Sequence, residues 1–312
     1  MGIYLGIDIG GRTVRAALSS GEELEYIKEE PLRKGELPQQ LVSMAGELCA
    51  RAGIKPAELE RACVASFGPM DLARGELMNP VHLFPTKRVP IVEPLQAELK
   101  VPVYLLNDCI AAAIGEHELG AAIGVSNFVF LNIGVGIGAG VYVDGRVVFG
   151  KDGNAHEVGH FTVDPKGECI CTCGRKGHWE AYCSGPGMVQ LAKLRGYPFT
   201  TPEAILEAAE KGDEKAVKLM EEVGRLNAIG LGNVVNAYDP EVVVLGGGVG
   251  LAGGELIIEP MRKHLPEYAV NAPPEFRVAR LGDKAGLYGA IIALRQDYLR
   301  DLLFLRSIRK VR

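Results

Sequence analysis

Residues 3–11, IYLGIDIGG, form a mainly apolar run that contains Asp8 and ends in the glycines Gly10 and Gly11. This pattern is typical of a β-strand that enters a tight glycine turn. Residues 127–140, NFVFLNIGVGIGAG, start the same pattern again. After each run the sequence continues as a β-meander, and helices then alternate with strands. We therefore predict an internal duplication of one α/β unit, with copies that begin near Ile3 and Phe128.

The segments that follow each run indicate which elements a copy contains. Residues 37–52 repeat apolar side chains at helical spacing, and residues 101–108, VPVYLLND, predict a buried strand followed by a helix. In the second copy, the dipeptide Asp144-Gly145 suits a tight hairpin. Further helices are predicted at residues 187–194, 202–211, 213–237 and 255–265, with a long closing helix at 285–303. The predicted fold class is therefore α/β, with two similar lobes and a ligand cleft between them.

The bulk composition of the 312 residues limits the possible functions. The formal net charge of −5 argues against a nucleic-acid partner, which usually meets a basic face. Glycines interrupt the longest apolar runs, so none predicts a membrane span of about 20 residues. The N-terminus has no signal-peptide pattern, so we expect a cytoplasmic protein. Three of the seven cysteines are clustered, which favours metal binding over disulfides.

Three glycine turns suggest contact with a nucleotide. Asp8-Ile9-Gly10-Gly11 places a carboxylate that can hold Mg²⁺ beside glycines whose N–H groups can approach phosphates, with a plain β-turn as the alternative. Gly134-Val135-Gly136-Ile137-Gly138 precedes a hairpin instead of a helix, which favours a second phosphate turn over a dinucleotide fold. Gly246-Gly247-Gly248 precedes a helix, but too few residues follow for a dinucleotide-binding sheet. We expect a backbone cradle for adenosine or ribose there.

Asn107-Asp108 directly follows the apolar strand VYLL. The carboxyl end of such a strand is the usual ligand edge of a parallel sheet. An aspartate there can accept the proton of a hydroxyl that attacks a phosphoryl group. The alternative is a cap on the following helix, because Asp is a favoured N-cap residue. The three glycine turns favour the catalytic interpretation.

Cys171, Cys173 and His178, with His160 upstream, offer four ligands of the types that zinc prefers. Because all four positions are filled, we expect a structural clip without an open catalytic position. Cys169 could replace one ligand, and Cys-x-Cys-x-Cys could instead form a redox cluster. The clip would fix a loop that carries polar side chains with the reach to hold sugar hydroxyls, namely Glu157, His160 and Glu180.

These residues together resemble the ROK family of sugar kinases, within the hexokinase/actin superfamily. The resemblance covers essentially the whole chain through the stretches GIDIGG, FGPMD, LNDCIAAAIGE, GVGIGAGVYVDGRVVFG, HEVGH, CTCGRKGHWE, VVNAYDPEVVVLGGGV and AGLYGA. It implies two ribonuclease-H-like lobes, ATP- and Mg²⁺-dependent phosphorylation of a hexose or amino-hexose, a structural Zn²⁺ and a homo-oligomer (dimer or tetramer). It also implies a small lobe of residues 1–110 with a C-terminal helix at about 295–312, and a larger lobe of residues 111–294.

The resemblance implies a role for each candidate residue. Asp108 is the general base, and the sugar is held by Asn107, Glu157, His160, Glu180 and Gly68. Phosphates and Mg²⁺ are faced by Asp8, Gly10, Gly11, Arg12, Thr13, Gly134, Gly136 and Gly138, and adenosine by Gly246, Gly247 and Gly248. Zinc is held by His160, Cys171, Cys173 and His178. His160 would use one ring nitrogen for zinc and the other for the sugar.

Some positions depart from the family pattern. Arg12 stands where the family usually has Thr, Val135 replaces the Thr of a Gly-Thr-Gly turn, and His178 replaces a third cysteine. Residues 77–90 follow the family's sugar-side segment only loosely. Val135 lacks the threonine hydroxyl that would lie near the γ-phosphate. ADP and polyphosphate therefore remain alternatives to ATP as the phosphoryl donor.

The residues do not select one sugar. We expect glucose or a broad range of hexoses phosphorylated at O6, with N-acetylglucosamine, N-acetylmannosamine and fructose as alternatives. Two other classes stay open. The first is a non-catalytic sugar sensor, which Arg12 and Val135 motivate. The second is a metal-dependent hydrolase at the Cys/His site.

Overall fold

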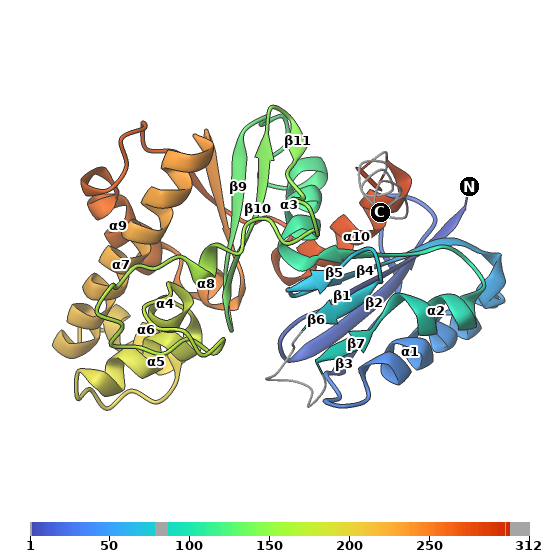
Figure 1. Cartoon of the computed structure of the whole chain (residues 1–312), viewed down its shortest axis with the longest axis horizontal. Coiled ribbons are helices and arrows are strands. Elements are labelled where there is room, and N and C mark those ends of the chain that lie inside the picture. The colour runs from blue at the N-terminus through green and yellow to red at the C-terminus, as the bar shows by residue number, and fades with distance from the viewer. Residues whose placement is uncertain (1, 79–86, 297, 300–312) are drawn as a thin grey trace. The chain divides into compact units, whose positions relative to one another are not determined.

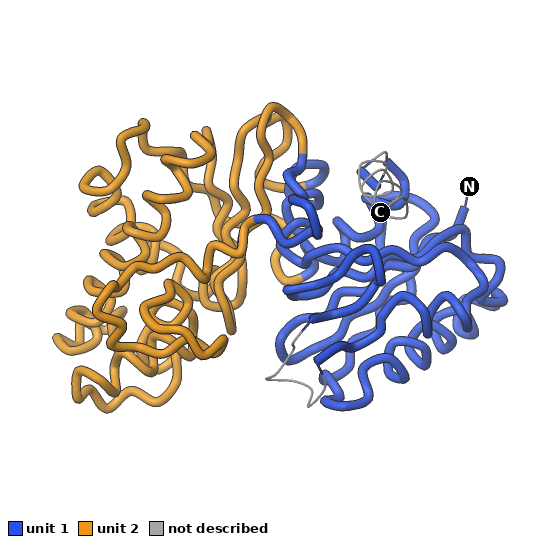
Figure 2. Tube along the Cα trace, in the orientation of Figure 1, with its two compact units in different colours: residues 1–119, 147–155, 284–312 blue, residues 120–146, 156–283 orange. Residues whose placement is uncertain are grey.

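The computed structural model describes residues 2–78, 87–296 and 298–299. The chain separates into two compact units, which Figure 2 shows in blue and orange. Unit 1 comprises residues 1–119, 147–155 and 284–312, and unit 2 comprises residues 120–146 and 156–283. The backbone therefore passes repeatedly from one unit to the other. Among the helices that the structure describes, none is long and apolar enough to cross a membrane.

Unit 1 is built on a five-stranded sheet in the order β3-β2-β1-β4-β8 (Figure 1). Its strands are β1 (Ile3–Ile9), β2 (Thr13–Ser19), β3 (Glu25–Pro31), β4 (Leu59–Ser66) and β8 (Val103–Asn107). The first three form the predicted antiparallel meander, whereas β1, β4 and β8 run parallel. Leu5, Ile7 and Ile9 of β1 are fully buried, so this strand lies in the core.

Helices cover both faces of this sheet. α1 (Leu37–Ala52) and α2 (Val92–Leu99) lie on one face, and α3 (Asp108–Leu119) and α10 (Ala285–Arg295) lie on the other (Figure 1). α10 approaches α3 so closely that a Cβ at Gly289 would lie 1.6 Å from the carbonyl oxygen of Ala111. Leu287 and Ile291 of α10 pack against Ala17 of β2. α10 therefore completes the core of unit 1, although it comes from the end of the chain.

Unit 2 repeats the strand order of unit 1. Its sheet has the order β11-β10-β9-β12-β13, with β9 (Phe128–Ile133), β10 (Ile137–Val143), β11 (Arg146–Val147), β12 (Val242–Gly246) and β13 (Glu275–Val278). β9 and β10 are antiparallel, whereas β12 runs parallel to β9 and β13. Asp144 and Gly145 both adopt positive φ, as a two-residue hairpin turn requires. The predicted duplication, with copies that begin near Ile3 and Phe128, is confirmed.

A long insertion between β11 and β12 contains α4 (Glu180–Cys183), α5 (Gly185–Leu194), α6 (Pro202–Glu210) and α7 (Glu214–Tyr238). α8 (Gly248–Gly253) and α9 (Glu255–His264) connect β12 with β13. Thr201 and Asp213 cap α6 and α7, because their side-chain oxygens accept hydrogen bonds from backbone N–H groups of the first turn. The helices predicted for this region are present, and their ends differ from the predictions by two residues or fewer.

Unit 1 also contains a small sheet that the sequence does not predict. Its strands are β5 (Met70–Asp71), β6 (Glu76–Met78) and β7 (Arg88–Pro90), paired in that order. Strands of two or three residues carry too little periodicity to be detected. Residues 79–86 of the loosely matching segment lie outside the described residues. Most residues of the expected C-terminal helix at 295–312 also lie outside the described residues. The closing helix predicted at 285–303 begins at the predicted residue but ends at Arg295, because Gln296 adopts an extended backbone.

Candidate functional site

The carboxyl ends of β1, β4 and β8 bring three predicted segments to one edge of the unit 1 sheet. Ile9 pairs with Ser66, and Ser66 pairs with Asn107, so the residues that follow these strands are neighbours. The segments are the Asp8–Gly11 turn, Gly68 and the Asn107-Asp108 pair. The first turn is tight, because the Gly10 N–H donates to the carbonyl oxygen of Thr13 at 2.9 Å. The exposed Arg12 lies at the tip of that turn.

The carboxylate of Asp8 is buried beside the start of α10. Its side chain is 8% exposed, and a Cβ at Gly286 would lie 2.8 Å from Asp8 Oδ1. Gly286 therefore leaves the room that this carboxylate occupies. Nothing in the spacing of Gly286 assigns it such a role in the sequence. A carboxylate beside a glycine turn fits Mg²⁺, which is usually held by one or two carboxylates and by substrate phosphates.

Asn107, and not Asp108, caps α3. Asn107 Oδ1 accepts hydrogen bonds from the backbone N–H groups of Cys109 at 2.9 Å and Ile110 at 3.1 Å. Asp108 is half-buried in the first turn, where its Oδ1 accepts from the Cys109 N–H at 2.8 Å. The helix-capping role given above as the alternative for Asp108 therefore belongs mainly to Asn107.

In unit 2, two predicted glycine turns lie side by side. β9 and β12 are parallel neighbours, and Gly246 pairs with Asn132. The turn after β9 closes on itself, since the Gly134 N–H donates to the carbonyl oxygen of Gly136 at 2.9 Å. Gly247 has φ 82°, and a Cβ there would lie 2.6 Å from Asn132 Oδ1. Two glycine turns thus expose backbone groups at the carboxyl end of the second sheet.

The four predicted zinc ligands converge in unit 2. The ligand atoms of His160, Cys171, Cys173 and His178 all lie within 4.8 Å of one another. A tetrahedral zinc with bonds of about 2.0–2.3 Å holds its ligands about 3.3–3.8 Å apart, so small side-chain rotations suffice. Cys173 Sγ already lies 3.3 Å from His178 Nδ1. Two thiols and two imidazoles suit structural zinc.

Cys169 lies outside this group of four. Its side chain is 1% exposed, and burial raises the pKa of its thiol to about 11. Its backbone N–H donates to the Tyr182 hydroxyl at 2.9 Å. Cys169 is therefore not one of the side chains whose ligand atoms converge in the Cys/His group.

Two glutamates surround His160. Its Nδ1 lies 3.2 Å from Glu157 Oε2, and its Nε2 lies 3.9 Å from Glu180 Oε1. Hydrogen bonds to Cys171 and to Glu157 raise the pKa of His160 to about 10. A carboxylate on the second ring nitrogen of a metal-binding histidine fixes the ring and raises its basicity.

Glu180 connects the Cys/His group with the glycine turn. Its Oε1 accepts a hydrogen bond from the Cys171 thiol at 2.9 Å and another from the Thr172 hydroxyl at 3.0 Å. A Cβ at Gly136 would lie 3.1 Å from its other oxygen, Oε2. The predicted sugar, zinc and phosphate residues of unit 2 therefore form one continuous cluster.

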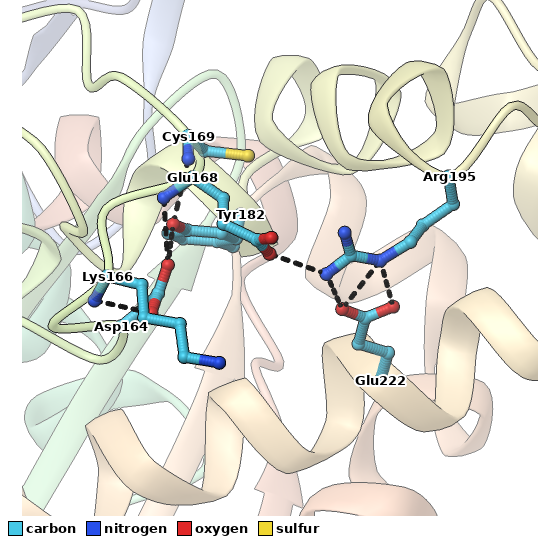
Figure 3. A network of polar contacts seen from close by, with 7 residues as sticks. All are labelled: Asp164, Lys166, Glu168, Cys169, Tyr182, Arg195 and Glu222. Atoms are coloured by element: carbon cyan, nitrogen blue, oxygen red, sulfur yellow. Dashed lines mark hydrogen bonds and ion pairs between the residues drawn. The ribbon is translucent and has the colours of Figure 1, made fainter.

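A polar network that the sequence analysis missed holds the base of the cysteine loop (Figure 3). Asp164 accepts hydrogen bonds from the Tyr182 hydroxyl and from the backbone N–H of Glu168. Arg195 then bridges Glu168 and Glu222, with Nη2–Oε distances of 2.8 and 2.6 Å. The loop is thereby tied to α4, α5 and α7. These residues lie far apart in sequence and match no motif, so only the fold reveals them.

The model of the ROK family matches residues 4–297. The chain belongs to the ROK family. The resemblance of its motifs to this family is therefore confirmed, and so is the predicted fold of duplicated actin/hexokinase-type lobes.

ROK proteins of several kinds are similar to this chain. A glucokinase from Pyrobaculum calidifontis is 35% identical over 291 residues, which cover 93% of this chain and 94% of the relative. An N-acetylmannosamine kinase from Haemophilus influenzae is 30% identical, with 92% and 93% covered. The crystal structure of a ROK family glucokinase from Streptomyces griseus in complex with glucose and AMPPNP is 28% identical. It has a TM-score of 0.79, with 95% of this chain and 100% of that chain covered.

The three departures from the ROK pattern have distinct surroundings. Arg12 is exposed at its turn, and Val135 is 50% exposed at the tip of the glycine turn after β9. Both side chains can therefore face a bound anion without repacking of the core. His178 is only 7% exposed and lies edge-on to the His160 ring, with centroids 5.2 Å apart. It occupies a ligand position in the Cys/His group, where imidazole serves zinc as well as thiolate does.

Proposed function

We propose that this protein transfers the γ-phosphoryl group of ATP to O6 of glucose or a related hexose. The chain is an ATP-dependent sugar kinase of the ROK family. The observation that carries the proposal is the edge of the unit 1 sheet, where Asp108 follows β8 and the Asp8 turn follows β1, with β4 between the two strands. The glucokinase relative and the solved glucokinase with glucose and AMPPNP support this assignment.

In the proposed reaction, O6 of the sugar attacks the γ-phosphorus, and the bond to the β,γ-bridging oxygen breaks. Asp108 accepts the hydroxyl proton, for which its position at the end of a parallel strand is suited. Backbone N–H groups of the Gly10 and Gly136 turns stabilise the charge on the transferred group. Asp8 would hold Mg²⁺, which neutralises phosphate charge when bound.

Glu157, His160 and Glu180 would hold the sugar hydroxyls. Carboxylates accept strong hydrogen bonds from hydroxyl groups, and two of them in fixed positions orient the ring. Zinc bound by the Cys/His group would keep the ring of His160 in place. The metal is structural in this proposal, because four protein ligands leave no open position.

The proposed base can be tested by replacement with an amide of the same shape. Asp108→Asn should lower kcat by about 10²–10⁴-fold, the range of general-base contributions, while glucose binding measured by calorimetry persists. Asp144→Asn is a matched control, because Asp144 lies in a hairpin turn at φ 52°, which Asn adopts readily. A rate for Asp108→Asn close to that of the control would rule out this base.

The identity of the sugar and donor is tested by a matrix of turnover measurements. The sugars are glucose, mannose, fructose, N-acetylglucosamine and N-acetylmannosamine, and the donors are ATP, ADP and polyphosphate. We expect the highest kcat/KM for glucose with ATP. The similarity to an N-acetylmannosamine kinase favours an amino-hexose as the second candidate. Sugar binding without turnover would favour a sensor.

A further inference from the structure

A short segment of unit 1, residues 147–155, is inserted between two parts of unit 2. The chain leaves unit 2 after Arg146 and returns to it at His156. Glu157, a proposed sugar ligand, is the next residue. The way in which this segment is held therefore affects the position of Glu157.

Asn154 attaches the segment to the loop that follows β4. Its Oδ1 accepts a hydrogen bond from the Met70 N–H at 2.8 Å, and its Nδ2 donates to the Met70 carbonyl oxygen at 2.7 Å. One side chain thus pairs with both backbone groups of a single residue, as a neighbouring strand would. Only an amide offers a donor and an acceptor in this arrangement.

Gly153 reinforces the attachment. It has φ 77°, and a Cβ there would lie 2.2 Å from Leu72 Cδ1. Residues 153–154 and 70–72 therefore fit together through two directed hydrogen bonds and one close apolar contact. Met70 and Leu72 are 1% and 6% exposed, so the attachment is to the buried part of the loop.

His156 attaches the other end of the segment to unit 2. Its backbone adopts φ 68°, which is unfavourable for a residue with a side chain. Its buried ring lies edge-on to Tyr238 of α7, with centroids 5.5 Å apart, and its Nδ1 is 3.3 Å from the Tyr238 hydroxyl.

We propose that Asn154 is a positioning residue for the sugar, because its two hydrogen bonds to Met70 fix the unit 1 loop that carries Gly68. Met70 is two residues after Gly68, so the two hydrogen bonds act close to this proposed sugar contact. The inference rests on the proposed function, in which Gly68 and Glu157 both face the sugar. Neither hydrogen bond of Asn154 involves a residue proposed to hold nucleotide.

The test compares Asn154→Ala and Asn154→Asp with Asn236→Ala. Asn236 makes a similar pair of bonds, donating to the Tyr268 carbonyl oxygen at 2.9 Å and accepting from the Val270 N–H at 2.8 Å. Its partners include no proposed site residue. Asn154→Asp keeps the acceptor for the Met70 N–H and loses the donor, so it provides an intermediate variant if the alanine variant folds poorly.

We expect Asn154→Ala to raise the KM and the Kd for D-glucose by about tenfold and to leave the KM for ATP within twofold. Asn154→Asp should show a smaller rise, and Asn236→Ala should lower Tm without changing the glucose constants. An unchanged glucose Kd in Asn154→Ala, or equal rises for glucose and ATP, would overturn the inference. A wild-type protein without glucose-dependent ADP formation would instead count against the proposed function, and glucose Kd values would still test Asn154.

Discussion

Gly230→Ala gives a sharp test of how α7 supports the site. Trp179 lies between the proposed zinc ligand His178 and Glu180 in the sequence, and it is fully buried. A Cβ at Gly230 would lie 2.2–2.5 Å from three atoms of its ring. The indole cannot slide away freely, because its Nε1 donates to Asn227 Oδ1 at 2.7 Å from the same helix.

The expected cost follows from these contacts. Carbon atoms prefer separations of about 3.5–4.0 Å, so the ring or the helix must move by more than about 1 Å. Overpacking of this kind costs about 1–3 kcal/mol, and a strained or lost indole hydrogen bond adds about 1 kcal/mol. Alanine offsets about 1 kcal/mol of this, because it is a better helix former than glycine. We expect a net loss of about 1–3 kcal/mol.

Gly46→Ala in α1 is the matched control. No atom lies within 4 Å of a Cβ at that position, so only the gain in helix propensity remains, about 0.5–1 kcal/mol. Thermal unfolding followed by circular dichroism should therefore give opposite changes in Tm. The loss at Gly230 corresponds to roughly 2–12 °C at about 2–4 °C per kcal/mol.

The functional readout of Gly230→Ala is the KM for glucose. It should rise because a displaced Trp179 also displaces its chain neighbours His178 and Glu180. The chain has a single tryptophan, so its fluorescence reports directly on this site. If Gly230→Ala melted at or above the wild-type temperature with an unchanged emission spectrum, the described packing of α7 on Trp179 would be wrong.

Two further predictions concern the cysteine loop. Cys173→Ser should lose the bound zinc and have a lower Tm, whereas Cys169→Ser should keep the zinc. Metal analysis of the purified variants measures the zinc content. Equal losses of zinc in the two variants would contradict the proposed ligand set. Burial opposes ionisation of Asp164, but hydrogen bonds from Tyr182 and from the backbone of Glu168 and Lys166 lower its pKa below the ordinary value of an aspartate. Its contribution to stability should therefore be full above about pH 4 and decrease as the pH falls through the lowered pKa. The difference in unfolding free energy between wild type and Asp164→Asn should shrink between pH 5 and pH 3, and a constant difference would refute this.

Much of the fold could be predicted because its signals are local and repeated. Each strand that begins a copy combines an apolar run with a glycine turn, and the two copies support one another. The convergence of the four proposed zinc ligands could also be predicted, because three of them lie within eight residues of sequence. The fourth, His160, was inferred from its residue type and nearness in sequence.

The rest depends on contacts between distant segments. Asn154 has no motif of its own, and its partner Met70 lies 84 residues away. Arg195 and Glu222 come from different helices, so their pairing follows from the packing of α5 and α7. The role of Gly286 depends on Asp8, which lies at the opposite end of the sequence. Physical reasoning from a single sequence finds local patterns, whereas these side chains are brought together only by tertiary structure.

The return of α10 to the first unit affects how the protein is made. A ribosome releases the first 119 residues long before α10, so the nascent sheet lacks the helix that packs against Ala17. At about 5–20 residues per second, residues 120–295 take roughly 9–35 s to synthesise. The first 119 residues must wait that long with an apolar surface uncovered, and α10 completes the core of the unit when it leaves the exit tunnel.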